Sequence, residues 1–163
     1  MYKKGHIGFA LALYAPILFV AVALFNELIL ATLGLLIVTK TARFPDIDWR
    51  VPLIAHRGIT HTVWFCLLIG AFFGGVFSLF GPLYPEAPHF PALFGFLIGV
   101  VATGSHLLAD MITPRGIRPL HPVSQRQYSL GLVKSSNTTA NTLALVLGGG
   151  LVTTSILLSL SII

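Results

Sequence analysis

The sequence predicts an all-α fold, a polytopic membrane helical bundle of about five transmembrane helices. Hydrophobic residues make up 55% of the chain and charged residues 9%, and the mean hydropathy is +0.89. A soluble domain carries roughly 25% charged residues, so this chain cannot cover a surface that faces water. The length of 163 residues fits a single membrane-embedded domain over residues 1–163.

Five apolar runs are long enough, or nearly so, to cross a bilayer. The first run follows Lys3 and Lys4 and so resembles a signal peptide, but it has no convincing cleavage site and is expected to remain as a span. The second run is near the short limit and could instead be a re-entrant or interfacial piece. The expected spans are Ile7–Phe25, Leu28–Ala42, Ile59–Phe80, Pro91–Thr113 and Asn141–Ile162.

The basic residues predict how these spans are oriented. All ten Lys and Arg residues lie before the first span, around the loop 43–58, or in the segment 114–140. The turn at residues 26–27, the loop 82–90 and the C-terminal tail contain none. The positive-inside rule makes the basic side cytoplasmic, with the N-terminus inside. We therefore attribute the net charge of +5 to topology and contact with anionic membrane lipids, and expect no nucleic-acid partner.

The side chains that could carry chemistry gather on that same side. His106 and Asp110 are four residues apart, so they share one face of a helix. An imidazole and a carboxylate on one face form half of a site for zinc or another divalent ion. The alternative for this pair alone is a buried hydrogen bond that locks two helices together. The full candidate set is His6, Asp46, Asp48, His56, His61, His106, Asp110 and His121.

This set includes all three Asp and five of the six His, and a purely structural role would scatter them over both sides. Single members keep ordinary alternatives. Asp46 and Asp48 could cap a turn through their own backbone, and His6 could anchor a helix at the interface. His56 and His61 are five residues apart and do not share a helical face. One of them can bind metal from the helix while the other acts from the loop as an acid or base.

Several short motifs resemble the LexA-regulated, YdjM-like family of membrane-bound, metal-dependent hydrolases. The most specific is His-Arg-Gly-Ile-Thr-His-Thr at residues 56–62. The others are Lys-Gly-His at 4–6, Phe-Pro-Asp-Ile-Asp-Trp at 44–49, His-Leu-Leu-Ala-Asp at 106–110 and Arg-Pro-Leu-His-Pro at 118–122. The resemblance implies a multi-pass protein of a bacterial or archaeal inner (cytoplasmic) membrane, with hydrolase activity.

The order of the candidate ligands is also similar, more distantly, to zinc-dependent phospholipase C and related single-strand nucleases. Those are helical proteins whose zinc cluster cleaves phosphodiesters. The similarity implies that Asp46 or Asp48 bridges two metals, that His61, His106 and Asp110 complete one metal, and that His6 and His121 bind its neighbours. Where that family has a closing His-x-x-x-Glu or His-x-x-x-Asp pair, this chain has Asn137-Thr-Thr-Ala-Asn141. One or two zinc ions are therefore expected rather than three.

The expected activity is hydrolysis of a phospholipid or lipid-linked phosphate at the cytoplasmic membrane face. A metal lowers the pKa of a bound water, and a guanidinium suits bidentate contact with phosphate. The expected catalytic residues are Asp48, His56 and Arg57, with Asp48 or His56 as acid or base. Arg115 and Arg118 could also contact phosphate, or could serve only topology and lipid attraction. The rival hypothesis is a non-catalytic metal-binding membrane protein, acting as a carrier, sensor or scaffold.

Overall fold

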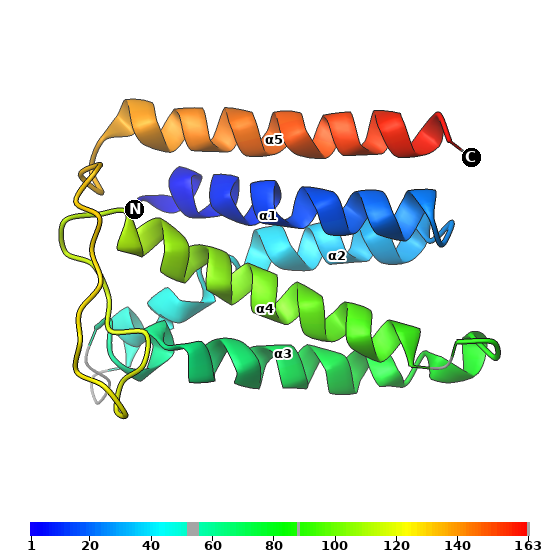
Figure 1. The fold of residues 1–163 in the computed structure, drawn as a ribbon, viewed down its shortest axis with the longest axis horizontal. Helices are drawn as coiled ribbons and strands as arrows, with labels where there is room; N and C mark the ends of the chain where they lie inside the picture. The colour runs from blue at the N-terminus through cyan, green and yellow to red at the C-terminus, as the bar shows by residue number, and fades with distance from the viewer. Residues whose placement is uncertain (52–55, 88, 163) are drawn as a thin grey trace.

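The computed structural model of the chain is an all-helical bundle (Figure 1). It describes residues 1–163 except 52–55, 88 and 163. Three short 3-10 turns connect or flank the helices: η1 (Phe44–Arg50), η2 (Ile59–His61) and η3 (Gly81–Leu83). The α-helices are α1 (Lys3–Ala23), α2 (Leu28–Thr41), α3 (Val63–Ser78), α4 (Phe90–Met111) and α5 (Thr138–Leu160).

Most of the helices have the length and composition of membrane spans. Among the described residues, four stretches are long and apolar enough to cross a bilayer, namely Lys3–Ala23, Leu28–Arg50, Phe90–Met111 and Thr138–Leu160, whereas α3 is a shorter apolar helix. The second of these joins α2 to η1. With 14 and 16 residues, α2 and α3 are about 21 and 24 Å long, shorter than a hydrocarbon core of about 30 Å. At the end of the bundle where the N-terminus lies, α2 and α3 stop short of the ends of α1 and α4 (Figure 1).

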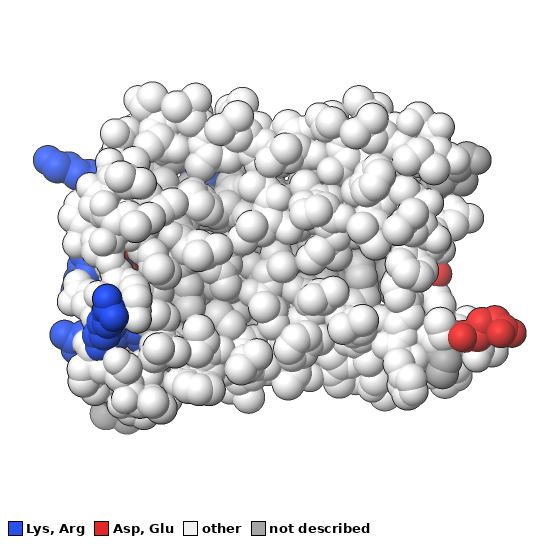
Figure 2. Space-filling view, in the orientation of Figure 1, with Lys and Arg blue, Asp and Glu red and all other residues white. Residues whose placement is uncertain are grey.

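Lys and Arg gather at one end of the bundle, beside Asp46, Asp48 and Asp110, and the remaining acidic residues lie at the other end. Figure 2 shows Lys and Arg side chains at the end where the N-terminus lies, and acidic side chains projecting at the opposite end. The opposite end holds Glu27, in the turn after α1, and the exposed Glu86. There the hydroxyl of Tyr84 donates to Oε2 of Glu27 at 2.9 Å, which ties the first turn to the segment after η3. The bundle thus shows the charge separation that the sequence predicts.

Helix α1 is the central element, because it packs against α2, α4 and α5, while α3 packs mainly on α4 (Figure 1). The contact with α5 is a close approach of two backbones. A Cβ on Gly148 would collide with the carbonyl of Gly8, and a Cβ on Gly8 would collide with the backbone of Ala144. Small residues allow such contacts between membrane helices, where tight packing replaces the hydrophobic effect as the driving force.

The helices follow the order that the sequence predicts, but several of their boundaries differ from the expected ones. Helix α1 begins at Lys3 instead of Ile7, and α5 begins at Thr138 instead of Asn141. The third span was expected to begin at Ile59, whereas α3 begins at Val63. Residues Ile59–His61 form the 3-10 turn η2 instead, and the Thr62 side chain caps α3 by accepting a hydrogen bond from the amide of Phe65 at 3.3 Å. Threonine is a favoured residue at this position. Residues 52–55 of the predicted loop 43–58 and residue 88 of the loop 82–90 lie outside the described residues.

Replacing Gly148 with alanine is expected to destabilise the bundle by about 1–3 kcal/mol, because the added methyl group forces α1 and α5 apart. The matched control is Gly149→Ala, since a Cβ at Gly149 meets nothing within 4 Å. That control should be neutral or slightly stabilising, because alanine favours helix more than glycine does. Thermal unfolding in detergent, followed by circular dichroism, measures both. Equal melting temperatures for the two variants would contradict the close approach.

Candidate metal centre

Four segments that are distant in sequence meet at the basic end of the bundle. The start of α1 supplies His6, η1 supplies Asp46, η2 supplies His61, and the last turns of α4 supply His106 and Asp110. All but Asp46 are buried, with at most 2% of each residue exposed. Ionisable groups buried at membrane depth are expensive unless they are paired or bind something. We refer to these five residues as the ligand cluster.

The centre of the cluster is a contact between two imidazoles. Nε2 of His61 lies 3.2 Å from Nε2 of His106. Nδ1 of His106 is 2.9 Å from the carbonyl oxygen of Ala42, which can only accept, so this nitrogen carries the proton. In the tautomer that this contact selects, Nε2 of His106 presents a lone pair.

The same reasoning fixes the tautomer of His61. The Thr60 hydroxyl donates to Asp48 at 3.0 Å, so it accepts from Nδ1 of His61, also at 3.0 Å. Burial and the neighbouring His106 lower the pKa of His61 to about 4, so this ring is neutral at pH 7. Two lone pairs therefore face each other. Two nitrogen ligands of a tetrahedral zinc ion lie about 3.3–3.4 Å apart, so the pair fits a shared metal.

Two carboxylates flank the imidazole pair. Oδ1 of Asp46 lies 3.4 Å from Nε2 of His106 and 3.9 Å from Nε2 of His61. Oδ2 of Asp110 lies 3.7 Å from Nε2 of His61 and 3.9 Å from Nε2 of His106. In the group His61, His106 and Asp110, one donor atom from each residue lies within 4.8 Å of the others. Nitrogen and carboxylate donors at this spacing are a set that zinc accepts.

His6 extends the cluster from α1. Its ring stacks on His106 with centroids 3.8 Å apart and an interplanar angle of 6°. Its Nε2 lies 3.6 Å from Oδ1 of Asp110, an oxygen that also contacts the amino group of Met1 at 2.7 Å. Its Nδ1 has no hydrogen-bond partner among the described residues. A buried polar atom without a partner is destabilising, and His6 forms a second possible ligand group with Asp46 and His106.

Asp48 lies behind the cluster rather than in it. Its Oδ1 accepts from Nδ1 of His56 at 2.9 Å, and its Oδ2 accepts from the amide of Arg57 at 2.9 Å and from Thr60. Both oxygens are thus engaged in orienting the segment that carries His61. The sequence left open whether Asp46 or Asp48 would be a ligand, and the geometry favours Asp46. His56 remains close, since it forms a third possible ligand group with Asp46 and His61.

Arg57 joins the turn region to the end of α4. One guanidinium nitrogen, Nη2, lies 2.9 Å from Oδ2 of Asp110, and the other, Nη1, donates to the carbonyl of Gly116 at 2.7 Å. The residue has φ +62°, a left-handed conformation uncommon for any residue other than glycine. Such backbone strain persists only where the surrounding contacts enforce it, and it concentrates at functional sites.

The structure does not bring His121, a predicted ligand, to the cluster. His121 lies in the segment after α4, with Nδ1 3.2 Å from Nε2 of Gln125, and it belongs to none of the three possible ligand groups among the described residues. Asn137 and Asn141 have structural roles. Asn137 caps α5 by accepting from the amide of Ala140 at 3.0 Å, and Asn141 accepts from the amide of Tyr2 at 2.9 Å, which fastens the start of α1 to α5.

Sequence reasoning missed two groups that set the histidine tautomers, the Thr60 hydroxyl and the Ala42 carbonyl. The position of Thr60 beside His61 in the 56–62 motif was the available signal, because a hydroxyl next to a candidate ligand can orient its ring. No sequence signal marks the Ala42 carbonyl, because every residue carries one.

Comparison with known protein families identifies the family to which the chain belongs. The model of a family described as YdjM inner membrane protein matches residues 1–163. The chain therefore belongs to this family, and the resemblance inferred from the short motifs is confirmed. No curated protein and no solved structure matches the chain. The similarity of the ligand order to zinc-dependent phospholipase C stays a prediction.

We expect the cluster to bind a divalent metal and His106→Ala to abolish that binding, because the change deletes one of the two imidazoles at the centre of the cluster. Elemental analysis of purified protein should find roughly one ion or more per chain in the wild type and a small fraction of that in the variant. The matched control is His89→Ala, since His89 is exposed at the opposite end of the bundle. Equal metal content in His106→Ala and wild type would show that the cluster binds no ion.

Proposed function

We propose that this member of the YdjM family is a metal-dependent phosphoesterase that acts on phospholipid or lipid-linked phosphate at the cytoplasmic face of the inner membrane. The observation that carries the proposal is the facing pair of imidazole lone pairs, 3.2 Å apart, flanked by two carboxylates and by an arginine. The donor set favours zinc, and three overlapping ligand groups leave room for one or two ions.

The residues that would hold the metal are His61, His106, Asp110, Asp46 and His6. The bound ion would supply positive charge to the phosphoryl oxygens and lower the pKa of a water molecule. Arg57 would add a second positive charge at the same place. Its side chain is only 12% exposed beside Asp110, and its buried Nε has no hydrogen-bond partner among the described residues, so the guanidinium has an unused donor beside the cluster.

Asp48 and His56 supply an acid or base beside the cluster. Because Asp48 accepts from Nδ1 of His56 at 2.9 Å, Nε2 of His56 is the nitrogen free to exchange a proton. The His56 side chain is 21% exposed and lines the same polar cavity as Asp46 and Asp110. A carboxylate that holds the tautomer of a partly exposed imidazole is the arrangement that general acid–base catalysis requires.

Two neighbouring cavities support a lipid substrate. The polar cavity over the cluster has a volume of about 490 Å³ and is lined in part by Met1, His6 and Asp110. An apolar groove of about 460 Å³ lies between α1 and α5, and Met1 lines it too. A substrate with a charged head and a hydrocarbon tail matches this pairing, and the basic end of the bundle is where anionic headgroups would gather.

The orientation of the bundle is part of the proposal. The ligand cluster lies at the same end as the Lys and Arg side chains, and the family is one of inner membrane proteins (Figure 2). The positive-inside rule then places the cluster and the N-terminus on the cytoplasmic side.

Asp110→Asn should abolish hydrolysis of phospholipid and of short-chain phosphodiester substrates while the protein stays folded, because the amide is a poorer metal ligand. The matched control is Glu86→Gln, the same chemical change at the opposite end of the bundle, which should keep wild-type turnover. Thermal unfolding with and without a chelator is measured alongside: the chelator should lower the melting temperature of wild type and leave that of Asp110→Asn unchanged. Wild-type protein that binds metal but turns over no phosphoester would instead support the carrier, sensor or scaffold hypothesis.

Cysteine labelling tests the orientation. In a Cys66→Ala background, Ser124→Cys should be protected from a membrane-impermeant maleimide in intact cells, whereas Glu86→Cys should react. The reason is that residues 124 and 86 lie at opposite ends of the bundle, after α4 and before it. Labelling of position 124 from outside would reverse the proposed topology.

A further inference from the structure

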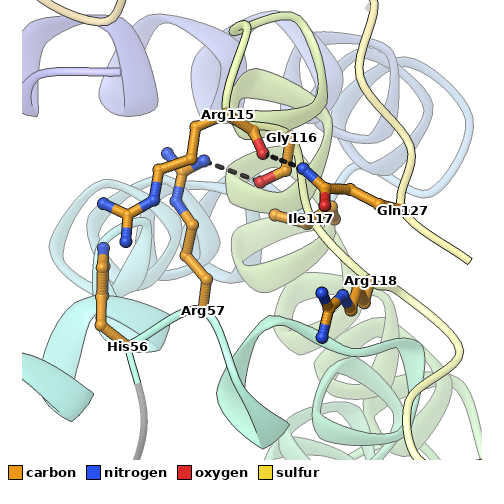
Figure 3. Close-up of a pocket in the computed structure, with 7 residues that line it drawn as sticks. All are labelled: His56, Arg57, Arg115, Gly116, Ile117, Arg118 and Gln127. Atoms are coloured by element: carbon orange, nitrogen blue, oxygen red, sulfur yellow. Dashed lines mark hydrogen bonds between the residues drawn. The ribbon is translucent and has the colours of Figure 1, made fainter. Parts of the chain in front are cut away.

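A small cavity beside the ligand cluster is lined by three arginines. It has a volume of about 240 Å³ and lies between the turn before α3 and the segment that follows α4 (Figure 3). None of the described residues that line it is Asp or Glu. We call it the arginine pocket; its residues are His56, Arg57, Arg115, Gly116, Ile117, Arg118 and Gln127.

Backbone hydrogen bonds hold together two of the segments that line the arginine pocket. Ile117 and Tyr128 exchange two hydrogen bonds, at 3.0 and 2.8 Å, so Arg118 and Gln127 are fixed on either side of this bridge. Gly116 has φ +59°, and a Cβ there would collide with the carbonyl of Tyr128. Only glycine therefore allows the two paired segments to approach each other so closely. Nε2 of Gln127 donates to the carbonyl of Arg115 at 2.6 Å, as Figure 3 shows.

The charges in this pocket are not balanced by the chain. Arg57 is paired with Asp110. Arg115 and Arg118 form no ion pair within the part of the chain that the structure describes. Like charges gathered around one cavity repel each other, and an anion inside it relieves that repulsion. Guanidinium groups also match the geometry of phosphate oxygens.

Arg57 links the arginine pocket to the ligand cluster. Its Nη2 contacts Asp110 of the cluster, and its Nη1 contacts Gly116 of the pocket. His56, Arg57 and Arg115 line both the arginine pocket and the polar cavity over the cluster. An anion in the pocket and a phosphoryl group at the cluster would therefore lie next to each other, on the two sides of one guanidinium.

We infer that the arginine pocket binds a second phosphate group of the substrate, adjacent to the one held at the ligand cluster. The substrate class is then a lipid diphosphate rather than a lipid monophosphate. This inference rests on the proposed function for the chemistry at the cluster, but the pocket itself is an anion site whether or not hydrolysis follows.

The test compares inorganic pyrophosphate with inorganic phosphate as ligands of the purified full-length protein in phosphatidylcholine nanodiscs, by isothermal titration calorimetry. Elemental analysis after each titration verifies that the metal has stayed bound. Wild type should prefer pyrophosphate, and Arg118→Gln should lower the ratio of the two affinities by roughly tenfold, the value of one charge-assisted hydrogen bond. The matched control is Arg126→Gln, an exposed arginine of the same segment that stacks on Tyr128 outside the pocket; it should leave the ratio unchanged.

An equal loss of preference in Arg118→Gln and Arg126→Gln would overturn the inference, because diffuse positive charge would then explain the binding. Absence of any pyrophosphate preference in wild type would overturn it too.

Hydrolysis assays on lipid monophosphate, lipid diphosphate and free pyrophosphate separate the two proposals. If no substrate is turned over but Arg118→Gln alone loses the preference, the proposed function fails and the pocket stands. Turnover of free pyrophosphate without turnover of lipid diphosphate would refute the lipid assignment.

Discussion

The basic end of this bundle depends on a contact that is unfavourable by itself, two imidazole lone pairs that face each other across 3.2 Å in a buried site. Each ring is held there by its other nitrogen. His106 is fixed by a carbonyl at the end of α2, and His61 by the Thr60 hydroxyl, which Asp48 orients in turn. The end of α2, the turn before α3 and the end of α4 are therefore arranged around the space between two nitrogens, and a cation in that space would turn repulsion into attraction.

The shortness of α2 and α3 makes this arrangement possible. Because both helices end before the level that α1 and α4 reach, irregular backbone lies beside the ends of those two helices (Figure 1). Backbone groups that are buried there need partners within the protein. Asp48 accepts from the amide of Arg57, and the amide of Val63 donates to the carbonyl of Pro119 at 2.9 Å. The polar network thus completes the fold where helical hydrogen bonding stops, as well as supporting the ligands.

Apolar runs and the placement of basic residues were sufficient to predict the helices, their order and the end of the bundle where the ligands gather. The spacing of His106 and Asp110 predicted their shared face, because both lie on one regular helix. The turns were harder to predict. Whether Asp46 or Asp48 points to the cluster depends on the path of the 3-10 turn, which is set by contacts with distant segments. His121 was predicted as a ligand from its place on the basic side and from motif similarity, but the pairing of Ile117 with Tyr128 directs its segment elsewhere.

Arg57 gives the site a property that neither of its contacts has separately. Its guanidinium neutralises the same Asp110 oxygen, at 2.9 Å, that a metal in the cluster would use. Arginine and metal are thus alternative cations for one carboxylate. An anion that drew the guanidinium toward Gly116 would leave Asp110 more strongly negative and so would raise the affinity of the proposed site for its ion. By thermodynamic reciprocity the ion would raise the affinity for the anion by the same factor, so the two halves of the proposed site would load cooperatively through a single side chain.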